Sequence, residues 1–257
     1  MDIARECAAE VLAAGDRALS RFNANWQAAR HEDRLGILAA RSQLLNYLAA
    51  AHVLDDTPRY SAACDALLER AEAFVERFRP TNEILLVELS LAMTAKRRPL
   101  AMVLAKAVLS GAVTGGLALE SFQTRSLAAL QEMDYPAAQL MVASLATACE
   151  GKAFDKLSCA QGLLWASAVQ QLAIGDGAAA EKAAQDLLRL HIRSIDRDLD
   201  KLKRGGASAF VPFDMLDFPG SALFSLIEAF GHAPQPFSEA AVACGYGLGL
   251  NPARAED

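Results

Sequence analysis

The clearest pattern of apolar positions along the chain begins at Thr57. From there, apolar side chains recur at alternating steps of four and three, at Tyr60, Cys64, Leu67, Ala71, Phe74 and Phe78. This spacing places them in one stripe on an α-helix, and a helix buries such a stripe. Thr57 is suited to cap the helix, Pro58 to occupy its first position and Arg79-Pro80 to end it. The pattern predicts one continuous helix over 57–79.

A second long helix is predicted over 178–203. Its apolar positions repeat the same spacing, at Leu188, Ile192, Ile195, Leu199 and Leu202. Gly205-Gly206 then supplies a stop. Similar periodicity between turn-forming residues predicts further helices at about 2–24, 32–54, 82–95, 99–112, 117–132, 136–149, 155–174, 217–230 and 237–246. No segment alternates apolar and polar residues between hairpin turns, so no strand is predicted.

These segments predict an all-α protein of about ten to eleven helices. Helices of similar length joined by short turns pack as antiparallel neighbours, and a pair of them here spans about 35 to 45 residues, as in helical-repeat arrays. We therefore expect a single domain over 1–257 with a solenoid-like arrangement and a flexible tail over 247–257. Trp26 and Trp165 lack the Leu-Gly pair of the tetratricopeptide signature, so any repetition is architectural.

Composition and charge narrow the class of partner. Hydrophobic residues make up 53% of the chain and charged residues 22%, which is typical of a folded globular protein. The formal net charge of −6 argues against direct binding to nucleic acid, which requires a concentrated cationic surface. An acidic chain is better suited to basic proteins.

The cysteines and the first residues indicate a cytoplasmic location. The five cysteines form no C-x-x-C pair, and most have apolar neighbours in sequence, as buried free thiols do in a reducing compartment. The first 22 residues carry several acids and no uninterrupted apolar stretch, so no signal peptide is predicted. Residues 99–119 are long enough to span a bilayer, but Lys106 and Gly115-Gly116 interrupt them. We expect a buried core helix and a turn there, and no membrane partner.

The residues that could perform chemistry are scattered. The histidines His31, His52, His191 and His232 are far apart and form no metal-binding motif. Cys149 and Cys159 have no neighbouring histidine in sequence, and no G-x-S-x-G motif is present. Asp55-Asp56 is interpreted as a pair of exposed acids at a helix terminus. We therefore expect no catalytic residues, no metal, no cofactor and no enzymatic activity.

The least helical segment, residues 205–222, holds Phe210, Phe213 and Phe218. Aromatic residues in a loop either plug the end of the core or form an exposed anchor for a partner, and the pattern leaves both readings open. If the loop is an anchor, we expect Phe210, Phe213, Asp214 and Asp217 to bind the partner, with the acids attracting a basic surface and the rings becoming buried.

A basic ridge is predicted along the second long helix, because its cations recur every four residues at Arg189, Arg193, Arg197 and Lys201. Asp186, Asp196, Asp198 and Asp200 lie among them. This interleaving favours a solvated, internally neutralised face over a site for an acidic ligand, without deciding between the two.

Three stretches, residues 34–78, 172–198 and 213–231, together resemble immunity protein family forty-nine, the helical antidotes encoded beside polymorphic bacterial toxins. Their common features are a long helix, an acidic turn and a second helix, then a helix ending in a His-and-Arg-rich run, then a loop and a Leu/Ala-rich closing helix. The resemblance covers about half of the chain and does not include residues 95–150.

The resemblance implies a protein that binds one cognate toxin domain and blocks it by occlusion, which requires no catalytic machinery. Many toxin domains of these systems are basic nucleases, whose association with an acidic chain would be electrostatically steered. The alternative is a helical-repeat adaptor or regulatory protein that binds a peptide or protein partner. An enzyme with a spatially assembled pocket is a third candidate.

Overall fold

The computed structural model describes residues 2–15, 17–28, 34–111, 118–151, 153–205 and 211–246, and every regular element within these ranges is helical. The predicted all-α class is confirmed. In chain order the elements are α1 (Asp2–Gly15), α2 (Ala18–Ala28), α3 (Arg34–Val53), α4 (Thr57–Leu68), α5 (Ala71–Phe78), α6 (Asn82–Thr94), α7 (Arg98–Leu109), α8 (Leu119–Gln131), α9 (Tyr135–Glu150), α10 (Lys156–Ala173), α11 (Gly177–Lys203), the 3₁₀ helix η1 (Pro212–Met215), α12 (Phe218–Ala229) and α13 (Glu239–Ala243).

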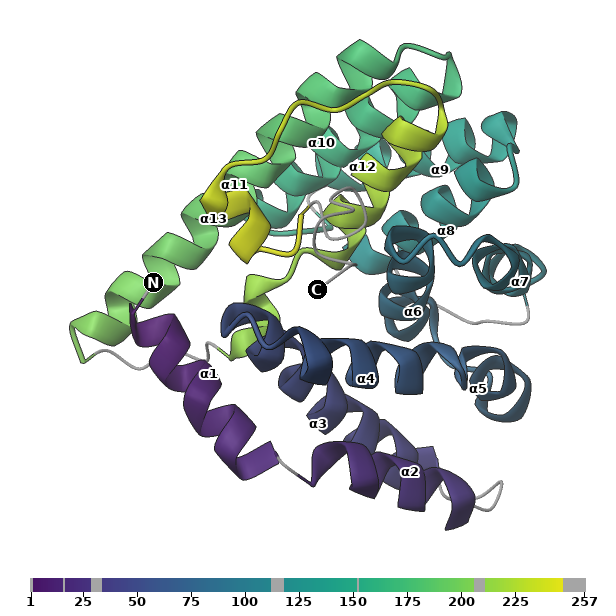
Figure 1. Ribbon diagram of the computed structural model, residues 1–257. Helices are drawn as coiled ribbons and strands as arrows, with labels where there is room; N and C mark the ends of the chain where they lie inside the picture. The colour runs from purple at the N-terminus through teal and green to yellow at the C-terminus, as the bar shows by residue number, and fades with distance from the viewer. Residues whose placement is uncertain are drawn as a thin grey trace.

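The helices pack largely as sequence neighbours. In Figure 1, α1 to α5 form one part of the molecule, in which α3 contacts α1, α2 and α4. In the other part, α8, α9, α10 and α11 follow one another, each packed against the next. The chain then returns, because α12 packs against α6 and α8 as well as α11. Consecutive packing is typical of a repeat array, and the repeats of an open solenoid contact only their neighbours. Here α12 contacts both α8 and α11, the first and last helices of the second part, so the array is closed.

Two of the predicted helices are each divided in two. The segment predicted at 2–24 forms α1 and α2, and the one predicted at 57–79 forms α4 and α5. At the second break, the Arg70 N–H donates to the carbonyl of Leu67, and the Arg70 guanidinium donates to the carbonyl of Ala66 at 3.0 Å. The stripe from Leu67 to Phe78 is nevertheless buried on both sides of the break. Periodicity thus predicted the buried face but not the interruption.

Among the described segments, four helix–helix turns share one backbone conformation: α3–α4, α6–α7, α8–α9 and α10–α11. Each contains one residue with a positive φ, namely Asp55, Lys96, Met133 or Gly175. The N–H of this residue bonds the carbonyl three residues earlier, and the next N–H bonds the carbonyl five residues before it. The two bonds satisfy carbonyls that a helix end leaves unpaired, as in a Schellman motif.

The residue after each left-handed position begins the next helix. At three of the four turns this residue is an aspartate that accepts a hydrogen bond from the backbone N–H three residues on, namely Asp56, Asp134 and Asp176. At the fourth turn it is Arg97, whose side chain makes no capping bond. Asp56 is therefore the cap of α4, and the prediction that Thr57 would cap it is wrong, because the aspartate stands one residue earlier at the end of the same turn. These turns recur about every 40 residues, so the repetition lies in the arrangement of helices and turns and not in a sequence motif.

One apolar cluster extends from Ala4 of α1 to Tyr246 beyond α13 and includes residues of both parts. Polar groups within it are paired. The fully buried Trp165 donates its indole N–H to Ser126 Oγ at 2.9 Å. Between α3 and α6, the buried Arg41 forms a two-pronged ion pair with Glu88 and also donates to the carbonyl of Ile84 at 2.9 Å.

Residues 99–119, which are long enough to span a bilayer, include all of α7 except Arg98. The buried face of α7 is formed by Ala101, Leu104, Ala105 and Val108. Met102, Val103 and Lys106 are exposed, so α7 is a core helix with one open face. The turn expected after it, at Gly115-Gly116, lies outside the described residues. Within the described ranges, no helix combines the length and the apolar character needed to cross a bilayer.

Phe74→Ala tests the buried stripe. Phe74 is 4% exposed, and its ring centroid lies 6.4 Å from that of Trp26 and 5.6 Å from that of Phe78. We expect the free energy of unfolding to fall by about 3 to 5 kcal/mol, measured by urea denaturation, because a cavity replaces the ring. Leu140→Ala, at a position that is 62% exposed, is the control and should cost less than about 1 kcal/mol. A similarly small loss for Phe74→Ala would place the stripe outside the core.

Met133→Gly tests the shared turn. Met133 has φ 58° and is 69% exposed, so its side chain gains little from packing. The left-handed region strains residues with a Cβ, and the change to glycine relieves this strain. Glycine also gives the unfolded chain more freedom, which offsets part of the gain, so we expect a net stabilisation of about 0.5 to 1 kcal/mol. Gly175→Ala is the reciprocal variant: a Cβ there meets nothing within 4 Å, so its expected loss of about 1 kcal/mol is conformational. Equal stability of Met133→Gly and the parent protein would contradict this account.

Candidate functional site

The predicted aromatic anchor lies where η1 meets α12. Phe210 lies outside the described residues. Phe213 is half-buried in η1, with its ring centroid 5.4 Å from that of the buried Phe218. Both rings pack against the core cluster. In the structure, Phe213 and Phe218 therefore plug the end of the core, which is the first of the two readings of this segment.

The two acids of this segment act as caps. Asp214 is exposed and accepts a hydrogen bond from the Val211 N–H at 2.8 Å. Asp217 begins α12, where one carboxylate oxygen accepts from the Gly220 N–H at 2.9 Å and the other accepts from the Tyr246 hydroxyl. Both oxygens of Asp217 thus accept hydrogen bonds within the chain. A role in partner binding stays a prediction, and Asp214 is the exposed acid that can fulfil it.

η1 is the meeting point of the three stretches that carry the family resemblance. α3, from the first stretch, packs against η1. From the second stretch, His191 of α11 lies with its Nε2 3.1 Å from the carbonyl oxygen of Met215, in the third. The fold thus brings η1 against α3, more than a hundred positions earlier in the sequence, and against His191, which is 24 positions before Met215.

The basic ridge of α11 is neutralised by its neighbours, as the interleaved acids favoured. Arg189 pairs with Asp186 at 2.6 Å, and Lys201 pairs with Asp198 at 2.9 Å. Arg197 lies 3.8 Å from Asp198. The ridge is solvent-exposed, and three of its four cations lie beside an acid of the same helix. The fourth, Arg193, donates instead to the carbonyl of Arg189 at 3.2 Å.

The described histidines make hydrogen bonds that tie segments together. His52 Nε2 lies 2.9 Å from the carbonyl oxygen of Val242, and His191 contacts Met215 as described above. His232 Nε2 lies 2.7 Å from Glu181 Oε2, while the other oxygen of Glu181 accepts from the Gln235 N–H. His31 lies outside the described residues. In the part of the chain that the structure describes, no three potential ligands cluster as a metal site would require.

The buried cysteines are held as neutral thiols. Burial is the main cause that raises the pKa of Cys64 and of Cys244 to about 12 and that of Cys149 to about 11. Cys149 and Cys159 lie beside each other, each thiol directed at the carbonyl of the other residue at 3.8 and 3.7 Å. A neutral thiol is a weak nucleophile, so these environments do not favour covalent catalysis.

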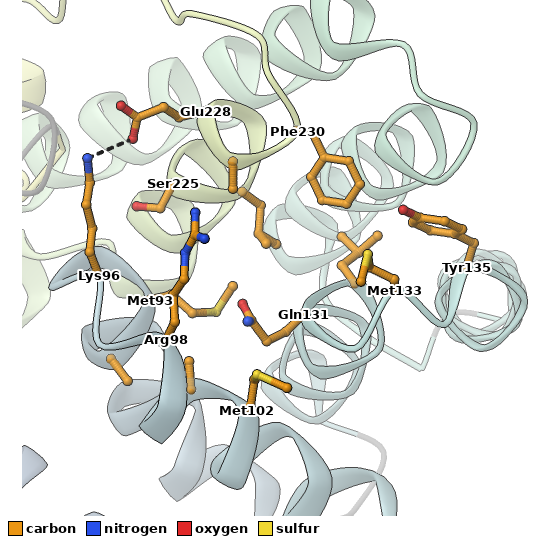
Figure 2. A pocket seen from close by; sticks show the side chains of 15 residues that line it. Met93, Lys96, Arg98, Met102, Gln131, Met133, Tyr135, Ser225, Glu228 and Phe230 are labelled. Atoms are coloured by element: carbon orange, nitrogen blue, oxygen red, sulfur yellow. Dashed lines mark ion pairs between the residues drawn. The ribbon is translucent and has the colours of Figure 1, made fainter.

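A cavity with a volume of about 650 Å³ opens between the α6–α7 turn, the α8–α9 turn and the second half of α12 (Figure 2). We call it the methionine groove. Its lining consists of Ala92, Met93, Lys96, Arg98, Ala101, Met102, Leu130, Gln131, Met133, Tyr135, Ser225, Leu226, Glu228, Ala229 and Phe230. The two turns belong to the repeated set, whose shared geometry places Lys96 and Met133 at the mouth.

The methionine groove combines an apolar lining with a charged rim. Met102 and Met133 are 42% and 69% exposed, and the rings of Tyr135 and Phe230 stand 6.1 Å apart. At the rim, Lys96 pairs with Glu228 across the gap at 3.3 Å, and Arg98 extends toward α12 (Figure 2). The sequence did not predict this groove, because its residues come from three separate parts of the chain. The only local signal was an exposed methionine at the α8–α9 turn.

Comparison with models of protein families, with curated proteins and with solved structures finds no significant match to this chain.

Alkaline unfolding tests the buried thiols. The pKa of Cys64 is raised from an ordinary 9.0 to about 12, so the folded chain keeps a proton that the unfolded chain loses above pH 9. The resulting stability is complete below pH 9 and is lost as the pH rises toward 12. We expect the urea midpoint of the parent protein to fall between pH 9 and 11, and to fall less steeply in Cys64→Ala. Ser61→Ala, on the exposed side of the same helix, should keep the parent slope, and an identical slope in Cys64→Ala would exclude the thiol as a cause.

Proposed function

We propose that this protein is a cytoplasmic immunity protein that binds a cognate toxin domain and neutralises it by covering its active site. It acts without catalysis, metal or cofactor. The observation that carries this proposal is the convergence of the three resembling stretches at η1, through the packing of α3 and the contact between His191 and the Met215 carbonyl. Stretches that share a binding role are expected to form one continuous surface rather than lie apart.

The charge of the chain supports the same function. A formal net charge of −6 favours association with a basic toxin domain such as a nuclease, and the exposed Asp214 lies on η1 itself. Phe213, half-buried beside it, is the apolar candidate for the centre of the interface.

A helical-repeat adaptor that binds a peptide is the second candidate. The repeated Schellman turns, spaced at about 40 residues, and the methionine groove between two of them favour it. Adaptor and immunity protein share the property of binding a protein partner, but they differ in the surface used.

Co-expression with the toxin domain encoded beside this chain tests the immunity function. We expect the parent protein to restore bacterial growth and the purified pair to have a nanomolar or lower Kd, because neutralisation leaves almost no free toxin. Continued toxicity despite full expression of the folded protein would reject the function.

Association kinetics of Asp214→Asn then test the η1 surface. The asparagine can still accept the bond from Val211, so the change removes charge and keeps the cap. We expect a two- to fivefold slower association at low salt, about equal rates at 1 M salt, and little change in dissociation. Glu150→Gln, an exposed acid at the end of α9, should leave both rates unchanged. Parent kinetics in Asp214→Asn would exclude η1 as the steering surface while leaving the function intact.

A further inference from the structure

The methionine groove has the features of a docking site that the immunity function does not use. Apolar and polar side chains both line it, and the methionines Met93, Met102 and Met133 come from three different elements around it. Flexible, polarisable methionine side chains can repack around differently shaped apolar groups. An open groove lined in this way fits the apolar face of a bound peptide segment, as in helix-in-groove recognition.

The charges at the rim of the groove favour a partner of one sign of charge. The basic run Lys96-Arg97-Arg98 lies in the α6–α7 turn, and two of its members are paired: Lys96 with Glu228, and Arg97 with Asp65. Within the described ranges no carboxylate pairs with Arg98, whose side chain extends over the groove (Figure 2). The rim therefore presents one unbalanced positive charge beside the apolar lining.

The position of Arg98 in its helix strengthens this preference. Arg98 is the first residue of α7, where the helix dipole is positive and disfavours a cation. An anion placed there would interact favourably with both the guanidinium and the amino end of the helix. The charge complementarity of the groove thus points to a carboxylate rather than to a basic group.

We propose that the methionine groove is a docking site for an acidic, amphipathic peptide segment of a partner protein, with bulky apolar side chains against the methionines and a carboxylate on Arg98. A second copy of this chain fits less well, because two molecules with a formal net charge of −6 repel each other. This inference goes beyond the immunity function and does not rest on it, since the toxin is assigned to the surface around η1.

Fluorescence anisotropy with two synthetic peptides tests the proposal on the full chain. One labelled peptide of about 16 residues carries leucines on one helical face and glutamates along its flanks, and the other has lysine in place of each glutamate. We expect micromolar binding of the acidic peptide and at least tenfold weaker binding of the basic one. Arg98→Glu should weaken binding of the acidic peptide at least tenfold and strengthen that of the basic peptide.

Two further variants keep the test specific. Met102→Lys changes a lining residue that is 42% exposed, so folding should persist while peptide binding falls at least fivefold. Arg193→Glu makes the same charge change as Arg98→Glu on an exposed face of α11 and should leave binding unchanged. Absence of binding, equal binding of both peptides, or equal effects of Arg98→Glu and Arg193→Glu would overturn the proposal. So would self-association in sedimentation that Met102→Lys abolishes, because the occupant would then be a second copy.

Discussion

The buried ion pair between Arg41 of α3 and Glu88 of α6 ties the first helices of the chain to those that follow. Both side chains are almost completely removed from solvent, and they lie beside the aromatic group of Phe22, Trp26 and Phe74. Taking two charges out of water is costly, and the cost is offset only when the geometry satisfies both groups. The forked contact with Glu88 and the bond to the Ile84 carbonyl do so in one relative position of α3 and α6. The pair thus joins α3 to α6, and the packing of α3 on η1 and of α4 on α6 accompanies it.

The repeated turns determine how consecutive helices follow one another. In each of them a left-handed residue ends one helix and the next residue begins another. Two of these turns face α12, which the chain brings back against α6 and α8. The methionine groove forms because this return leaves the turns close to the end of α12 without filling the space between them. Its location follows from the closure of the array rather than from any local motif.

How much could be predicted depended on whether a feature is local. The stripe of Cys64, Leu67, Phe74 and Phe78 was recognisable because a buried helical face has a fixed period. The break after Leu68 was not, since no proline or glycine marks it and Arg70 ends the helix through bonds to nearby carbonyls. Asp217 looked like an exposed loop acid, but its partner, Tyr246, is 29 positions away, and such a pairing has no signature in the chain. The ridge of α11 was predictable because its acids and bases are neighbours on one helix.

The amino-acid sequence by itself determined the helical class, most helix positions and the turns, because capping and helical periodicity act over a few neighbouring residues. It also determined the formal net charge of −6. Only the tertiary structure decided which helices meet: it placed the His191 ring at the Met215 carbonyl, paired Arg41 with Glu88, and set Arg98 over a groove built from three distant segments. The physical reason is that packing and the pairing of buried polar groups act between residues that are close in space, whatever their separation along the chain.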